Sequence, residues 1–301
     1  MAILVFGGTG LIGSSIVRAL AGRGEHVMVA SRRPGHIGVA NVEWLHCDVG
    51  QRQAVQSAFA TGRPQRVVHL AAALQFECAN DPSLAARVNI AGTSNVLECA
   101  REAGVERVVF GSSVAVYGER HDLMREDDPP GPSLSIYGAA KLFEERLGAA
   151  MARRGGAQFV ALRYSAVFGA GSFEGRGMSR VRNMIASTFS GQDVEIADAS
   201  GDEAAQLTYV SDAADATLRA LDVSALGHPV YNVAGPPENY ATLREFAQSV
   251  GQLSPRAGHV TFSGRAASLG RVDLSRIEND LQWTPQVRIS EGLRILFGAR
   301  A

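Results

Sequence analysis

The chain has 301 residues, of which 46% are hydrophobic and 20% are charged, as in an ordinary globular protein long enough to bury a large core. Its 29 basic and 30 acidic residues give a formal net charge of −1, so the basic excess of a nucleic-acid-binding protein is missing. Because no apolar run reaches the length of about 18 residues that a membrane span needs, we expect neither a nucleic acid nor a membrane as a partner.

The cysteines and histidines indicate the setting of the protein. The three cysteines form no Cys-x-x-Cys pair, and the seven histidines are scattered without the spacing of metal ligands. Cysteines of this kind are typical of reduced, buried thiols in a cytoplasmic protein. We therefore expect a cytoplasmic location and no metal site.

Short apolar strands and amphipathic helices alternate over the first part of the chain. The patterns predict strands at 3–6, 27–30, 67–70, 108–110 and 159–163, and helices at 11–21, 51–60, 83–103 and 137–153. Strands that are apolar on both faces lie between helical layers. The alternation therefore predicts an α/β fold, a Rossmann-type doubly wound parallel sheet with a smaller C-terminal substrate-binding lobe. We expect a dinucleotide-binding domain in residues 1–165, to which residues 207–222 return, and the substrate-binding lobe in residues 166–301.

A glycine-rich loop joins the first predicted strand to the first predicted helix. Gly7, Gly10 and Gly13 follow the pattern G-x-x-G-x-x-G. The first glycine permits a tight turn, the second lets the backbone approach a pyrophosphate, and the third brings the helix close to the sheet. The helix N-terminus supplies N–H donors for the phosphates. The loop residues expected to contact a dinucleotide are Gly7, Thr9, Gly10, Leu11, Ile12 and Gly13.

The end of the second strand bears on which dinucleotide is bound. An acidic residue at this point would bind the adenine-ribose hydroxyls of NAD, but the chain has Ser31, Arg32 and Arg33 instead. A guanidinium there can bind a 2′-phosphate through charge-assisted hydrogen bonds. We therefore favour NADP(H) over NAD(H), with a solvated basic loop as the alternative interpretation.

Two further strand ends are candidates for cofactor contacts. Asp48, followed by Val49, could accept a hydrogen bond from the adenine amino group. The predicted strand at 67–70 ends at the carboxyl edge of the sheet with Leu70, followed by Ala71 and Ala72. Ligands of such folds bind at this edge. The small side chains of these residues leave room for the cofactor backbone.

A tyrosine and a lysine open the helix at 137–153. Tyr137 and Lys141 are four residues apart and therefore share one helix face. An ammonium group favours the phenolate, so we expect Lys141 to lower the pKa of Tyr137 toward the range of a general base. Ser112 and Ser113 follow the strand at 108–110, where a hydroxyl can bind a substrate oxygen beside the tyrosine.

Together, the glycine loop, the Ser-Ser strand end and Tyr-x-x-x-Lys resemble the extended short-chain dehydrogenase/reductase family, the NAD-dependent epimerase/dehydratase group. Further stretches along nearly the whole chain look like its landmarks: Asn89-Ile90-Ala91-Gly92-Thr93, Arg125-Glu126-Asp127, Thr208-Tyr209-Val210-Ser211-Asp212, Tyr231-Asn232-Val233 and Leu281-Gln282-Trp283-Thr284-Pro285.

The resemblance implies a role for each matching residue. Tyr137 is then the general acid and base, Lys141 holds the nicotinamide ribose, and Ser113 is the catalytic serine. Asn89 is then expected to lie against the cofactor. The residues that we expect at the substrate are Ala73, Ser112, Ser113, Ser165 and Arg176.

Three departures from the family pattern narrow the chemistry. Val114 and Ala115 stand where family dehydratases carry Asp-Glu, so we expect no dehydration. Ala205 replaces an arginine that grips a nucleotide phosphate, which counts against a nucleotide-diphosphate substrate. Ala166 replaces an asparagine of the pattern R-x-x-N-V-Y-G.

The sequence thus predicts hydride exchange at a secondary alcohol or ketone carbon of a sugar, nucleotide sugar or similar polar alcohol. An epimerase that keeps its cofactor and an NADPH-dependent reductase of a non-nucleotide ketone both remain open. A more remote alternative is an NADP(H)-sensing binding protein, but such relatives generally lack the Tyr/Lys pair. A homodimer through the helices at 83–103 and 137–153 is open as well, since core packing explains the same residues.

Overall fold

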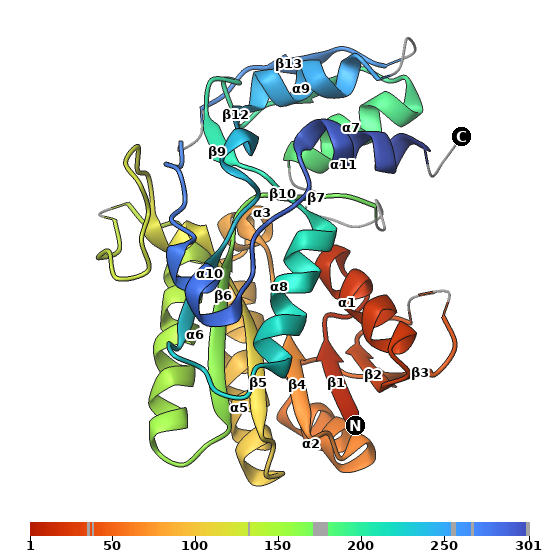
Figure 1. Ribbon diagram of the computed structural model, residues 1–301, viewed down its shortest axis with the longest axis vertical. Coiled ribbons are helices and arrows are strands. Elements are labelled where there is room, and N and C mark those ends of the chain that lie inside the picture. Colours follow the sequence, from red (N-terminus) through yellow and green to blue (C-terminus); the bar gives the residue numbers. More distant parts are fainter. Residues whose placement is uncertain are drawn as a thin grey trace.

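The computed structural model describes residues 1–34, 37, 39–131, 133–170, 180–253, 257–265 and 268–298. A parallel sheet of seven strands is its centre, in the order β11-β6-β5-β4-β1-β2-β3 (Figure 1). The strands are β1 (Ala2–Phe6), β2 (His26–Ser31), β3 (Val42–His46), β4 (Arg66–His69), β5 (Arg107–Ser113), β6 (Gln158–Tyr164) and β11 (Val230–Val233). The predicted α/β fold with a doubly wound parallel sheet is confirmed. Strand order reverses between β1 and β4, which is where such sheets bind ligands.

Two helical layers bury the two faces of the sheet. Helices α1 (Leu11–Gly22), α8 (Val210–Asp222) and α10 (Ser275–Leu281) share one hydrophobic core with Ile3 and Val5 of β1. Helices α2 (Arg52–Gly62), α5 (Gly92–Glu102) and α6 (Ile136–Arg153) cover the opposite face, where Leu4 and Phe6 point. Alternate residues of one strand thus enter different cores, as the period of two requires.

The long helix predicted at 83–103 is interrupted. The structure has α3 (Gln75–Asn80), a single turn α4 (Pro82–Leu84), a π-helical segment η1 (Ala85–Ala91) and then α5. Such π segments are uncommon and concentrate at functional sites. The apolar periodicity continues through the change of winding, so the pattern did not reveal it.

A smaller lobe lies over the carboxyl edge of the sheet (Figure 1). Helices α7 (Arg180–Ser190), α9 (Leu243–Gly251) and α11 (Ile289–Gly298) pack there around buried Phe168, Phe246 and Leu293. The remaining elements are three short strand pairs and two 3₁₀ turns: β7 (Val167–Phe168) with β10 (Thr208–Tyr209), β9 (Ala204–Gln206) with β12 (Tyr240–Thr242), β8 (Val194–Ile196) with β13 (Val260–Phe262), η2 (Val114–Tyr117) and η3 (Pro237–Asn239).

The chain returns to the sheet after entering the lobe. Helix α8 packs against α1, and β11 pairs with β6 at the edge of the sheet. The lobe boundary at residue 165 stays a prediction. Both β11 and α10 come after this residue in the sequence, yet they pack with the sheet. Within the described ranges, no helix has the length and apolar character needed to cross a membrane.

Candidate functional site

The glycine loop turns from β1 into α1 at the centre of the carboxyl edge. Gly7 has φ +80°, a left-handed conformation that favours glycine. A Cβ atom on Gly7 would lie 2.7 Å from the Ala71 nitrogen, and one on Gly13 would lie 2.3 Å from the Gly7 carbonyl oxygen. The loop backbone therefore fits closely both to β4 and to its own helix.

The start of α1 is suited to an anion. Gly10 is its N-cap residue, and the first turn carries no acidic side chain. The first N–H groups of a helix have no partner within the helix, and the helix dipole adds positive potential there. The residues present thus fit a dinucleotide pyrophosphate at this point.

The end of β2 presents a basic surface. Arg32 and Arg33 are exposed, and neither forms an ion pair among the described residues. Ser31, the last residue of β2, directly precedes them in the chain. Its hydroxyl donates to the Arg33 carbonyl at 2.7 Å and accepts from Trp44 Nε1 at 2.9 Å. Asp48 is half-buried, and its Oδ1 accepts from the Gly50 N–H at 2.9 Å.

Asn89 shapes the loop that follows β4. The Ala73 N–H donates to Asn89 Oδ1 at 2.7 Å, and Asn89 Nδ2 donates to the Ala73 carbonyl at 3.0 Å. Asn89 and Ala73 are both buried. The side-chain amide of Asn89 and the backbone of Ala73 thus hydrogen-bond each other. Direct contacts of these two residues with a cofactor or substrate stay predictions. Leu70, Ala71 and Ala72 are partly exposed beside this pair.

The predicted catalytic residues lie together on β5 and α6. Ser135 caps α6 by accepting a hydrogen bond from the Gly138 N–H at 3.0 Å, which places Tyr137 in the first turn. The Ser113 hydroxyl accepts from the Ala115 N–H at 3.1 Å and lies near the Tyr137 hydroxyl, whose pKa it lowers. The Lys141 ammonium is 5.8 Å from the Tyr137 ring centroid. The spacing of four residues thus does gather this pair on one face.

The electrostatics of Tyr137 differ from the expectation. The pKa of Tyr137 is raised: burial and the nearby Glu144 carboxylate raise it, while the ammonium of Lys141 and the hydroxyl of Ser113 lower it. The predicted direction of the Lys141 effect is correct, but the expected net fall of the pKa is wrong for the protein without cofactor. Desolvation disfavours the charged phenolate.

A buried carboxylate beside Lys141 was not among the predicted site residues. Glu144 Oε2 lies 3.3 Å from Lys141 Nζ, and the two side chains are 0% and 2% exposed. Thr93 donates to Glu144 Oε1 at 2.5 Å, and His69 Nε2 lies 3.0 Å from the Thr93 hydroxyl. The sequence spacing could have indicated Glu144, because residues 137, 141 and 144 lie on the same face of α6, and this face packs inward.

A second buried network fixes α6 to the sheet. Arg163 on β6 donates to both carboxylate oxygens of Glu145, at 2.9 and 2.7 Å, and to the Tyr117 hydroxyl at 2.9 Å. Ser112 donates to Glu145 Oε1 at 2.5 Å. The hydroxyl of Tyr117 in turn donates to Asn232 Oδ1 on β11 at 2.7 Å. These bonds fix the middle of α6, at Glu145, against β5 and β6.

The predicted substrate contacts are only partly presented to a ligand. Ser112 is buried with its hydroxyl on Glu145, and Ser165 is buried with its hydroxyl on the Gln206 carbonyl. Ser113 is half-exposed beside Tyr137. Arg176 lies outside the described residues. Ala205 lies in β9, opposite Ala241 of β12.

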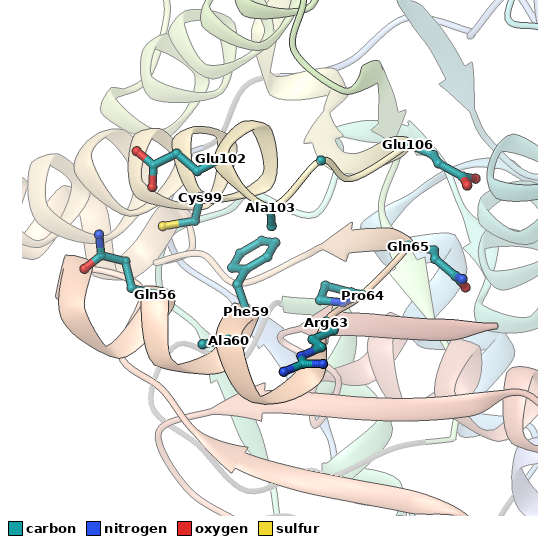
Figure 2. A pocket seen from close by; sticks show the side chains of 11 residues that line it. Gln56, Phe59, Ala60, Arg63, Pro64, Gln65, Cys99, Glu102, Ala103 and Glu106 are labelled. Atoms are coloured by element: carbon teal, nitrogen blue, oxygen red, sulfur yellow. The ribbon is translucent and has the colours of Figure 1, made fainter.

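A cavity of about 700 Å³ lies at the opposite edge of the sheet. Figure 2 shows its lining between α2 and α5, including Phe59, Arg63 and Glu102. Pro64, Gln65 and Glu106 directly precede β4 and β5, so the cavity is at the amino ends of the strands and away from Tyr137. Across the described ranges, no group of His, Cys, Asp and Glu side chains could hold a metal ion.

A glycine loop at the switch point of a parallel sheet, with Ser, Tyr and Lys side chains at the same edge, defines a dinucleotide-dependent oxidoreductase class. The profile of the NAD dependent epimerase/dehydratase family matches residues 3–234. The chain belongs to this family of NAD(P)-dependent enzymes, and the resemblance to extended short-chain dehydrogenases is confirmed.

Individual relatives agree with the family. The chain is 36% identical over 174 residues to a UDP-glucose 4-epimerase of Halalkalibacterium halodurans, a match covering 56% of this chain and 52% of that protein. It is 26% identical to a putative UDP-glucose 4-epimerase of Methanocaldococcus jannaschii, with 97% and 96% covered. The solved UDP-glucose 4-epimerase of Thermus thermophilus with NAD aligns with a TM-score of 0.86 at 31% identity, covering 99% and 98%.

Proposed function

We propose that the protein is an epimerase of a nucleoside-diphosphate sugar, which oxidises a carbinol carbon and reduces it again from the other face. The observation that carries the proposal is the adjacency of Ser113 and Tyr137, with Lys141 one turn along α6, at the edge where the glycine loop also lies. The UDP-glucose 4-epimerases among the relatives support this substrate class.

Each side chain then has a defined task. Tyr137 accepts the proton of the substrate hydroxyl as the carbonyl forms, and it returns a proton as the hydroxyl is restored. Ser113 donates a hydrogen bond to the same oxygen and orients it. Lys141 supplies the positive charge that favours the phenolate form of Tyr137. NAD(P), held by the glycine loop and the residues after β2 and β4, supplies hydride acceptance and donation.

An NADPH-dependent reductase is the second candidate, favoured by the two exposed guanidiniums after β2, Arg32 and Arg33. A relative named as a reductase, the 3-diazoavenalumate denitrifying reductase of a Streptomyces species, is 29% identical over 270 residues. Mass spectrometry of nucleotides released from the denatured protein separates the two functions. Stoichiometric retained dinucleotide, together with interconversion of UDP-glucose and UDP-galactose observed by NMR, supports the epimerase. An empty protein that oxidises NADPH with a ketone contradicts it.

The preference for NADP(H) is part of the proposal. Arg32 and Arg33 are exposed at the end of β2, where the chain offers no carboxylate to ribose hydroxyls. We expect tighter binding of NADPH than of NADH, and a loss of about tenfold in that preference in Arg32→Ala. Arg23→Ala is the matched control, because Arg23 is exposed at the amino end of β2 and pairs with Asp222. Equal affinity of the wild type for both cofactors would contradict the preference.

We further propose a homodimer in which α5 and α6 of two copies pack together. The two helices are neighbours, and α6 exposes Phe143 and Ile136 by 48% and 44%. Large apolar side chains exposed side by side on a helix favour association. Sedimentation velocity should give a dimer for the wild type and a monomer for Phe143→Glu. A monomeric wild type rules the interface out.

A reducing, cytoplasmic setting belongs to the same proposal. Cys47, Cys78 and Cys99 are buried free thiols, and burial raises the pKa of each, that of Cys47 to about 12. Such thiols are inert structural residues rather than disulfide partners. Fractionation of the source cells with immunodetection tests the location.

A further inference from the structure

The mechanism above leaves a buried carboxylate unused beside its lysine. Glu144 is fully buried, and among the residues that the structure describes its Oε2 atom has no hydrogen-bond partner apart from the ion-pair contact with Lys141 Nζ at 3.3 Å. Burying a charge is costly unless the charge is paired and hydrogen-bonded. A glutamate in this place is therefore expected to do more than fill space.

The hydrogen-bond directions define the charge state around Glu144. Burial, aided by the Lys141 charge, lowers the pKa of His69 to about 3, so its ring is neutral. Thr93 has one hydroxyl proton, and donating it to Glu144 requires Thr93 to accept from His69 Nε2–H. His69 Nδ1 is then a bare acceptor, consistent with its lack of a partner among the described residues.

The opposite arrangement is less favourable. A protonated Glu144 that donates to Thr93 would make Thr93 donate to His69 Nε2. The ring proton would move to Nδ1, where a buried N–H would have no acceptor, at a cost of about 1–3 kcal/mol. Burial raises the pKa of Glu144, whereas the ammonium of Lys141 and the hydrogen bond from Thr93 lower it, so the carboxylate form depends on these two partners. The ionised Glu144 is therefore the form that fits this chain of hydrogen bonds.

We propose that Glu144 is a positioning residue, which anchors the Lys141 ammonium from below the site and divides its positive charge between two anions, the Glu144 carboxylate and the Tyr137 phenolate. Thr93 and His69 hold Glu144 in place. The inference rests on the proposed role of Tyr137. Its consequence is that Glu144 offsets part of the Lys141 effect, so that Tyr137 is a weaker acid and its phenolate a stronger base than Lys141 would make them if unopposed.

Few other charged or titratable groups reach this cluster. Tyr137, Lys141 and Glu145 face Glu144 from α6 itself, and Thr93 faces it from α5. His69 reaches the cluster from β4 through Thr93, and the Cys78 thiol lies near it on α3. Burial raises the pKa of the Cys78 thiol, so this group is neutral near neutral pH.

The experiment measures the ionisation of Tyr137 without any substrate. The full-length protein with saturating NAD⁺ is titrated by ultraviolet absorbance, and the curve of a matching Tyr137→Phe protein is subtracted. Glu144→Gln should lower the pKa of Tyr137 by about one unit, because the raising carboxylate is gone. Glu144→Asp, with a shorter carboxylate, should lower it by about half as much.

Thr93→Val is the matched control for packing, since it removes the hydrogen bond to Glu144 but leaves the carboxylate. We expect it to shift the Tyr137 pKa less than Glu144→Gln does, because Glu144 keeps its contact with Lys141. An unchanged titration in Glu144→Gln overturns the proposal, and so does an equal shift in Thr93→Val. Should Glu144→Gln fail to fold, an unchanged titration in Glu144→Asp overturns it instead.

This result is separable from the proposed function. The predicted shift in Glu144→Gln with no conversion of UDP-glucose supports the role of Glu144 and contradicts the substrate. Conversion of UDP-glucose without a shift of the Tyr137 pKa in Glu144→Gln supports the substrate and contradicts the role of Glu144.

Discussion

At β1 the carboxyl edge of the sheet offers backbone groups, whereas at β5 and α6 it offers buried charged side chains. The dinucleotide half consists of a glycine turn whose Cβ positions are blocked and a helix start without acidic residues. The acid–base half places Lys141, Glu144 and Glu145 below 3% exposure inside one helix face. The dinucleotide half requires positions without side chains, whereas the acid–base half requires charged side chains that pair with one another.

The two halves should therefore fail differently. A backbone site tolerates no added atom, because the neighbouring carbonyl and amide cannot move away. A buried charged network tolerates a change of shape but not the removal of one partner, which leaves an uncompensated charge.

Gly13→Ala should abolish detectable dinucleotide binding. The added Cβ would lie 2.3 Å from the Gly7 carbonyl oxygen and 2.8 Å from Gly8 Cα, so the loop must open. Gly22→Ala, at the other end of α1, meets nothing within 4 Å and serves as the control. Calorimetric titration with NAD⁺ and NADP⁺ measures both. Near-native affinity in Gly13→Ala would mean that the loop does not hold the pyrophosphate.

Tyr137→Phe should lower kcat by about 10²–10⁴-fold, the usual contribution of a general acid–base group. Dinucleotide affinity should stay within about twofold of the wild type, since the ring remains and only the hydroxyl near Ser113 is lost. Steady-state kinetics on UDP-glucose and a binding titration separate the two effects. Turnover close to the wild-type rate would show that another group moves the proton.

The same contrast explains what could be predicted from the sequence. The backbone site could be predicted from Gly7, Gly10 and Gly13, because only glycine fits the turn and the close packing of the loop. Tyr137 and Lys141 were found from a spacing of four residues. Glu144 was not, because a Glu-Glu pair in a helix normally indicates a solvated face. Ser112 and Ser165 look like site residues in the sequence, but tertiary hydrogen bonds to Glu145 and the Gln206 carbonyl engage their hydroxyls.

Glu145→Gln should lower the free energy of unfolding by about 3–5 kcal/mol, the usual cost of removing one partner of a buried ion pair. It would leave the Arg163 guanidinium, 5% exposed, without its carboxylate. Asp215→Asn is the control, because it breaks the exposed pair with Arg219 on α8 and should cost about 0.5 kcal/mol or less. Urea unfolding measures both. Equal losses would show that burial does not govern the value of these pairs.

His69 should make the stability of the protein depend on pH, in a direction fixed by its depressed pKa. Below pH 6.5 the unfolded chain protonates this histidine, but the folded chain does not until about pH 3. The folded state therefore loses up to about 1.4 kcal/mol per pH unit as the pH falls through this window. His69→Asn removes this loss, so its unfolding free energy should fall less steeply than that of the wild type between pH 6.5 and 4.5, and the two curves should run parallel above pH 7. His26→Asn, at an exposed position on β2, should keep the wild-type slope. Identical slopes in the wild type and His69→Asn would mean that His69 takes up its proton in the folded protein, and the hydrogen bonds that join it to Thr93 and Glu144 would then need a charged imidazole.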